Sequence, residues 1–271
     1  MPKEKSTRAK KKKGGEVMTK GRTNKNVEGP VEFQEQTTME TSTNNGFEGE
    51  MDVSPRDEPS GFRMENSRET IREQQVWVVG SSIVKRAFLA ARIRPDGVNL
   101  GLMDRLNVSI WWQGKGGMGW YEMYNKIKTL LKVADPPDYI ILHCGGNNIG
   151  YTPIKQLIQD MKGTIDKIWK LLPNTKLVWS QILPRKNWYS SDSIEKMNNS
   201  AKRINSSVAA YIVRNGGCYI KYLDIKLVNT NLFEADGVHI SNIGNEIFLN
   251  NISAGLEQFI TNGWQVYPKL Y

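Results

Sequence analysis

Five short motifs carry the side chains of this sequence that could do chemistry. They are Gly80-Ser81-Ser82, the glycine-rich stretch 113–119, the segment 143–148 (His-Cys-Gly-Gly-Asn-Asn), Leu183-Pro184-Arg185 and Asp236-Gly237-Val238-His239. Four of them hold groups useful for acyl transfer: a serine hydroxyl at a tight turn, glycine N–H groups, an asparagine amide, and an aspartate three residues before a histidine. Together such groups would make a nucleophile, a general base, an orienting carboxylate and an oxyanion hole.

The elements that must position these motifs follow from hydrophobic periodicity. Short apolar runs predict strands at 76–79, 108–112, 139–142, 176–182 and 218–223. Apolar residues spaced by three and four predict helices at 83–91, 120–133, 154–172, 194–213 and 242–260. This alternation is typical of a parallel sheet with helices on both faces, whose ligands bind beyond the carboxyl ends of the strands. The motifs fall near those ends.

The order and spacing of the motifs resemble the SGNH (GDSL-like) hydrolase family. The resemblance covers about residues 75–262, with a C-terminal extension at 263–271, and more narrowly it points to the SGNH-type domains encoded by some vertebrate retroelements. It implies an α/β fold: a three-layer α/β/α sandwich with a five-stranded parallel sheet, similar to flavodoxin.

Carried over residue by residue, the resemblance implies functional roles. Ser82 would be the nucleophile, His239 the general base, and Asp236 the carboxylate that orients His239. The backbone N–H groups of Ser82 and Gly117, with the side chain of Asn147, would form the oxyanion hole. The Ser82 hydroxyl should then lie within about 3.5 Å of a ring nitrogen of His239.

Two points of the match differ from the family or stay open. The family has aspartate before the nucleophile, where this chain has Ser81, which bears on the rigidity of the nucleophile turn. Gly116 and Gly119 are alternatives to Gly117.

The expected function is that of a serine esterase or acyl hydrolase. It would act through a covalent acyl-enzyme on a small-molecule, lipid or carbohydrate ester, with no metal or other cofactor. The alternative is a catalytically weak or inactive binding or assembly module that keeps the fold and contacts nucleic acid through its basic tail.

Residues 1–74 have the composition of a disordered tail. They lack Trp and Tyr and are rich in small polar and charged residues. Residues 1–25 hold ten basic and two acidic side chains, whereas 26–74 hold four basic and twelve acidic ones. The run at 8–13 is typical of a nuclear-import signal, of a nucleic-acid contact, or of a solvated tail without a partner. The net charge of +9 belongs to residues 75–271.

Other candidate sites are weaker. His143 and Cys144 are adjacent on a strand and should point to opposite faces, so Cys144 is expected to be a buried apolar residue. No Cys or His pair has the spacing of a zinc site. The glycines of 114–119 match a dinucleotide-binding pattern but follow the second strand instead of the first. Aromatic residues that could line a pocket, or pack in the core or a lid, are Trp111, Trp112, Trp120, Trp188 and Tyr189.

The sequence also bears on compartment. No run approaches about 18 consecutive apolar residues, so a membrane-spanning helix is not expected. The N-terminus has no apolar core of the kind found in secretory signals, and two cysteines make no disulfide framework, so an intracellular location, cytoplasmic or nuclear, is expected. No feature of the sequence predicts the oligomeric state.

Overall fold

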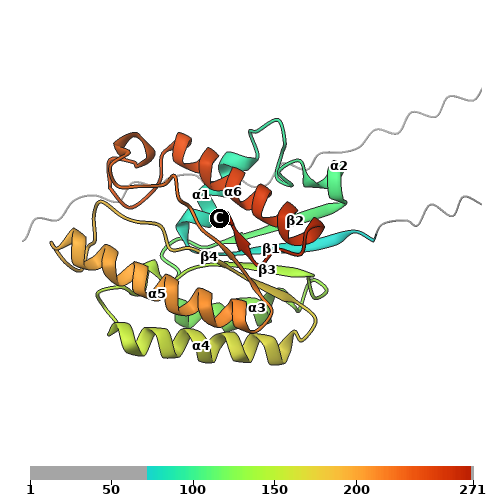
Figure 1. The fold of residues 1–271 in the computed structure, drawn as a ribbon, viewed down its shortest axis with the longest axis horizontal. Coiled ribbons are helices and arrows are strands. Elements are labelled where there is room, and N and C mark those ends of the chain that lie inside the picture. The colour runs from blue at the N-terminus through green and yellow to red at the C-terminus, as the bar shows by residue number, and fades with distance from the viewer. Residues whose placement is uncertain (1–71, 270–271) are drawn as a thin grey trace, which may run out of the picture. The chain divides into compact units, whose positions relative to one another are not determined.

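The computed structural model describes residues 72–269, and all elements given below lie in this range (Figure 1). The predictions for the tail, with its basic segment 1–25 and acidic segment 26–74, lie outside the described residues except at 72–74. Gln74 is the first residue of the first strand, so the sheet begins one residue before the predicted boundary.

The sheet contains six strands that all run parallel, in the order β2-β1-β3-β4-β5-β6. Their bounds are β1 Gln74–Gly80, β2 Val108–Gly114, β3 Tyr139–His143, β4 Lys176–Ser180, β5 Cys218–Ile220 and β6 Val266–Tyr267. The five predicted strands are present, although β4 and β5 end earlier than expected. The sixth falls in the segment predicted as an extension, and its two residues are too few to show a periodic signal.

Helices cover both faces of the sheet and make a three-layer sandwich (Figure 1). The α-helices are α1 Ser82–Ala91, α2 Leu102–Leu106, α3 Met123–Leu130, α4 Ile154–Leu171, α5 Ile194–Arg214 and α6 Asn242–Thr261, and short 3-10 helices occupy Trp120–Glu122, Gly146–Asn148 and Thr230–Leu232. The sequence did not predict α2, whose five residues are too short for a periodic pattern. The helix predicted at 120–133 begins as a 3-10 turn and ends three residues early.

Two apolar cores lie on opposite faces of the sheet. One joins α1, α2 and α6 to strand residues such as Val76 and Val78, and the other joins α3, α4 and α5 to alternate residues such as Trp77 and Val79. Both faces of the central strands are therefore buried, which explains their nearly continuous apolar sequence. Full burial of each such aliphatic side chain contributes about 1.5–3 kcal/mol relative to exposure.

The carboxyl ends of three neighbouring strands, β2, β1 and β3, lie side by side. Gly80 at the end of β1 pairs with Gly114 of β2 and with His143 of β3. A Cβ atom at Gly80 would lie 2.1 Å from the carbonyl oxygen of His143, so only glycine allows β1 to turn here against β3. The fold thus brings motifs that are distant in sequence to one edge.

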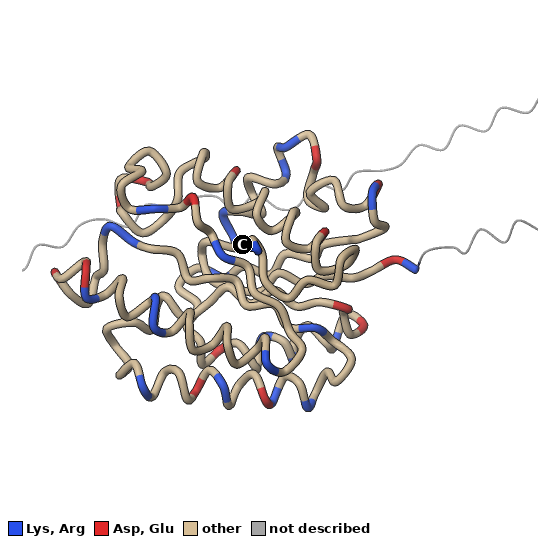
Figure 2. Tube along the Cα trace, viewed as in Figure 1, with Lys and Arg blue, Asp and Glu red and all other residues tan. Residues whose placement is uncertain are grey.

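Charged residues are spread over the helical layers, and α4 carries both basic and acidic residues along its length (Figure 2). Within residues 72–269, no helix is both long enough and apolar enough to cross a bilayer.

Candidate active site

Ser82 is the first residue of α1 and follows the sharp turn at the end of β1. The turn is held by main-chain hydrogen bonds of Ser81: its N–H donates to the His143 carbonyl at 3.2 Å, and its carbonyl accepts from the Lys85 N–H at 3.2 Å. Ser81 is buried, and its hydroxyl does not cap the helix. The backbone therefore fixes this turn although Ser81 stands where the SGNH family, which the motifs resemble, has aspartate. The first-turn N–H of Ser82 has no acceptor within its own helix.

Asp236 and His239 lie in a tight loop that precedes α6. The Oδ1 atom of Asp236 accepts hydrogen bonds from the backbone N–H groups of Val238 and His239, each at 2.9 Å. Gly237 supplies the left-handed conformation, φ +67°, that the loop requires. The Glu234 N–H also donates to the His239 carbonyl at 2.9 Å. These bonds fix the Asp236 carboxylate beside Nδ1 of the His239 ring.

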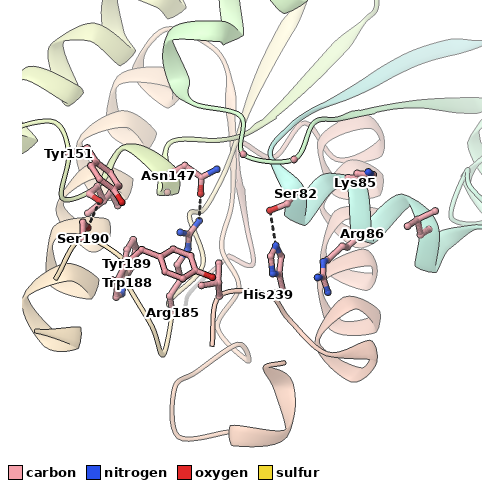
Figure 3. Close-up of a pocket in the computed structure, with 16 residues that line it drawn as sticks. Ser82, Lys85, Arg86, Asn147, Tyr151, Arg185, Trp188, Tyr189, Ser190 and His239 are labelled. Atoms are coloured by element: carbon pink, nitrogen blue, oxygen red, sulfur yellow. Dashed lines mark hydrogen bonds between the residues drawn. The ribbon is translucent and has the colours of Figure 1, made fainter. Parts of the chain in front are cut away.

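The three side chains form a continuous hydrogen-bonded row (Figure 3 shows its outer half). His239 Nε2 lies 2.9 Å from Ser82 Oγ, and His239 Nδ1 lies 2.5 Å from Asp236 Oδ2. Ser82 and His239 are 157 positions apart in the sequence, yet the distance between their side chains is within the limit of about 3.5 Å that we expected.

The electrostatics of the row determine its protonation. Desolvation alone would raise the pKa of Asp236, but hydrogen bonds from the His239 ring and from the N–H groups of His239 and Val238 outweigh it and lower the pKa to about 2. The carboxylate is thus ionised at neutral pH and accepts a hydrogen bond from the Nδ1–H group of His239. This tautomer leaves the Nε2 lone pair facing the Ser82 hydroxyl.

Ser82 lines a cavity of about 800 Å³. Helix α1 forms one side of this cavity, and the other side is formed by Asn147, Arg185, Trp188 and Tyr189 (Figure 3). Gly116 and Gly117 form part of its wall, and Gly117 has a φ of +69°. The N–H of Gly119 instead donates to Glu122 Oε1 at 3.0 Å. Of the three glycines considered as the backbone donor of the oxyanion hole, Gly119 thus already has its N–H in a hydrogen bond.

The Asn147 side chain is oriented by a donor and an acceptor. Its Oδ1 accepts from Arg185 Nη2 at 3.0 Å, and its Nδ2 donates to the Met118 carbonyl at 3.1 Å. Because a guanidinium can only donate, the amide oxygen must face Arg185, and the second N–H of Nδ2 remains for another acceptor. The next residue, Asn148, has a structural role, since its Oδ1 accepts a hydrogen bond from the backbone N–H of Trp120 at 2.8 Å.

Arg185 is the residue of this site to which the sequence assigned no role. It is the fifth residue after the end of β4, in the Leu-Pro-Arg motif, and only 8% of it is exposed. Burial lowers its pKa to about 10, so it keeps its charge at neutral pH. Its guanidinium carbon lies 4.9 Å from the centre of the Trp188 ring. The sequence did hold a signal for a role of this residue: an arginine shortly after the strand predicted at 176–182, where the other motifs also lie at the strand ends.

Comparisons with known proteins bear on the fold. No family model matches the chain, and no curated protein does. A GDSL-like lipase from Bacteroides thetaiotaomicron has a TM-score of 0.53 at 14% identity, covering 70% of this chain and 89% of the lipase. The chain has the fold of this lipase.

Two further solved structures share this GDSL-type fold. A member of the lipolytic protein G-D-S-L family from Veillonella parvula gives a TM-score of 0.53 at 17% identity, covering 69% of this chain and 98% of its own. TesA gives 0.51 at 20% identity, covering 68% and 98%. At these identities the likeness concerns the three-layer architecture, and the chemistry must be argued from the site itself.

The neighbouring His143 and Cys144 do not line the cavity beside Ser82. His143 packs against Phe248 on one face of the sheet, whereas Cys144 belongs to the core on the other face, as predicted. Burial lowers the pKa of His143 to about 3 and raises that of Cys144 to about 12. The Cys144 thiol is therefore protonated and buried, as an apolar residue would be.

The aromatic residues noted in the sequence divide between core and cavity. Trp112 and Trp120 are buried in the two cores, and Trp111 packs against the core that contains Trp120. Trp188 and Tyr189 line the cavity, the first buried and the second exposed. Within residues 72–269, no group of three or more His, Cys, Asp or Glu side chains is arranged to hold a metal ion.

Proposed function

We propose that the protein is a serine hydrolase that cleaves carboxylic esters through a covalent acyl-enzyme. The observation that carries the proposal is the hydrogen-bonded row from Ser82 through His239 to Asp236 at the wall of the cavity. The GDSL-type fold supports it, because two neighbours of that fold are described as a lipase and a lipolytic protein. The narrower resemblance to retroelement-encoded domains is part of the same proposal and rests on the sequence motifs.

The first half of the reaction forms the acyl-enzyme. His239 Nε2 accepts the hydroxyl proton while Ser82 Oγ bonds to the ester carbonyl carbon, and ionised Asp236 stabilises the resulting imidazolium. The carbonyl oxygen becomes an oxyanion that accepts from the N–H groups of Ser82 and Gly117 and from Asn147 Nδ2. The carbonyl then re-forms, the bond to the alcohol oxygen breaks, and His239 returns the proton to the departing alcohol.

The second half repeats these steps with water. His239 takes a proton from a water molecule, whose oxygen attacks the acyl carbon. The same donors stabilise the second oxyanion, and its collapse releases the acid and returns the proton to Ser82 Oγ. No cofactor takes part.

Labelling with a fluorophosphonate tests the proposal. We expect labelling of the wild-type protein and none of Ser82→Ala, with hydrolysis of 4-nitrophenyl acetate falling by about 10³-fold or more in the variant. Ser81→Ala is the matched control, because Ser81 holds the turn through its backbone and should remain labelled. A folded wild-type protein that neither reacts with the probe nor hydrolyses the ester would contradict the proposal.

The second candidate function is a binding module, supported by the excess of basic residues in 1–25 and by serine at position 81. It would take the place of the hydrolase if the folded protein is not labelled and the full chain binds RNA or DNA with affinity that falls steeply with salt.

A further inference from the structure

The cavity beside Ser82 carries more positive charge than ester hydrolysis requires. Among the described residues, its lining includes three basic residues, Lys85, Arg86 and Arg185, and no acidic residue. Asp236 lies behind His239 and is engaged by the imidazole and by the backbone of its own loop. The positive end of α1 also faces the cavity at Ser82. The electrostatic potential therefore favours a negatively charged occupant.

Arg185 is the most informative of the three. Among residues 72–269, no carboxylate lies within 4.0 Å of its guanidinium. Its side chain makes one hydrogen bond, to the neutral oxygen of Asn147, and stacks on Trp188. A guanidinium has five N–H donors, and a buried charge is normally paired with an opposite one. Among the described residues, Arg185 therefore has no carboxylate in contact and feels only the more distant charge of Asp236, and its open side is the cavity.

Two further basic residues extend this charge along α1, on the side of Ser82 away from Arg185 (Figure 3). Arg86 is neutralised in part by Glu234, whose carboxylate lies 3.1 Å away. Lys85 is exposed and has no carboxylate within 4.0 Å among the described residues. Lys85 can thus attract an approaching anion, whereas Arg185 offers the fixed fork that suits a carboxylate or phosphate.

We propose that the cavity binds an ester that carries a carboxylate or phosphate group, and that Arg185 binds this group while Lys85 attracts it at the rim. The proposal rests on the proposed function and names its substrate class. Arg185 then has two contacts at once: it orients the Asn147 amide through Nη2 and binds the substrate anion through its remaining donors.

The test uses pairs of esters that differ in charge. 4-Acetoxybenzoate and its methyl ester place the charge on the leaving alcohol, and mono-4-nitrophenyl terephthalate and its methyl ester place it on the acyl group. In both pairs the charged group is para and cannot attack its own ester. For each pair, kcat/KM of the charged ester is divided by kcat/KM of the neutral ester. This ratio is then divided by the ratio of the rate constants with which hydroxide hydrolyses the same two esters, which corrects for their different intrinsic reactivity. We expect a corrected ratio above about ten in one pair at low salt, decreasing as salt is added. 4-Acetoxyphenyl phosphate then distinguishes phosphate from carboxylate.

Variants at Arg185 separate binding of the anion from orientation of Asn147. Arg185→Met should slow both esters by loss of Asn147 orientation, and in addition lower the charged-to-neutral ratio by about tenfold or more. Arg185→Lys should lose activity on both esters but retain part of the ratio, because the charge remains. An equal loss on both esters would assign Arg185 to orientation alone and would overturn the proposal.

Lys85→Gln serves as a test that does not depend on a buried residue. It should lower the charged-to-neutral ratio by about two- to threefold, whereas Lys167→Gln, on exposed α4, should leave the ratio unchanged. If Ser82 is labelled and neutral esters are hydrolysed, but the corrected ratios are one or less in both pairs, this inference is overturned and the proposed function is not. Absence of labelling and of all hydrolysis would overturn the proposed function and this inference with it.

Discussion

The two histidines of the described chain each lie 2.9 Å from a serine hydroxyl, yet they sit in opposite surroundings. His239 faces Ser82 at the cavity, and its other nitrogen meets the Asp236 carboxylate. His143 faces Ser180 inside the protein, and the Ser180 hydroxyl continues to Tyr222 at 2.6 Å. The His143 ring is also packed edge-on against Phe248.

The two surroundings differ in the two features that the proposed reaction needs, which are stabilisation of an imidazolium and access from the cavity. Burial lowers the pKa of His143 to about 3 and raises that of Tyr222 above its ordinary value, so both stay neutral. No carboxylate is within hydrogen-bonding distance of His143 among the described residues, so an imidazolium there would not be stabilised. At His239, the carboxylate and the open cavity supply both the charge stabilisation and the access. We therefore expect variants at the two sites to affect different properties.

Asp236→Asn should have the largest effect on this contrast. The amide oxygen would stay with the backbone N–H groups of Val238 and His239, so the NH2 group would face Nδ1 and donate to it. The wrong tautomer of His239 would then face Ser82, and kcat/KM for 4-nitrophenyl acetate should fall by about 10⁴-fold. Tyr222→Phe is the corresponding change at the buried site and should leave kcat/KM unchanged. Wild-type rates in Asp236→Asn would show that the row does not act as described.

Asn147→Ala should reduce kcat by about 10²–10³-fold, because one donor to the oxyanion is lost. Steady-state kinetics should show the loss mainly in kcat, with a smaller change in KM. Asn148→Ala is the control in the same turn: it removes the acceptor for the Trp120 N–H and should lower stability more than catalysis. If Asn147→Ala retains the wild-type kcat, this side chain is not an oxyanion donor.

The buried histidine should make stability depend on pH. Its pKa in the folded protein, about 3, lies below the ordinary 6.5, so the unfolded chain binds a proton between these values and the folded chain does not. The stabilisation is complete above pH 6.5 and is lost as pH falls toward 3, by about 1.4 kcal/mol per unit.

Urea unfolding of wild type and His143→Gln at several pH values within that window measures this effect. The variant should show a shallower decrease in the free energy of unfolding as pH falls, since the other titrating groups are shared by both proteins. Parallel curves would mean that His143 is not neutral in the folded state.

Ser180→Ala should have the smallest effect and should act on stability. It removes the hydroxyl shared by His143 and Tyr222 and leaves two buried polar groups without that partner, at a cost of about 1–3 kcal/mol in the free energy of unfolding. Chemical denaturation measures the loss, and kcat/KM at neutral pH should be unchanged. A large loss of activity in the folded variant would link this buried chain to the site.

Local pattern was sufficient for much of the fold. Strand residues such as Val76–Val79 are apolar because both faces of the sheet are covered, and the long helices show their buried stripe directly. The short elements α2 and β6 were missed because five or two residues hold too little periodicity.

Residue types and order by themselves determined which motifs would lie at the carboxyl edge, because a parallel sheet brings all its strand ends to one side. Only the tertiary structure decided how those motifs meet: that Ser82 faces His239 across 157 residues, that Gly119 is engaged by Glu122, and that Arg185 holds Asn147 with no carboxylate of residues 72–269 in contact. The physical reason is the distance along the chain over which each kind of information acts. Periodicity records burial over a few residues, whereas a hydrogen-bond partner or a missing counter-ion depends on packing between segments far apart in the chain.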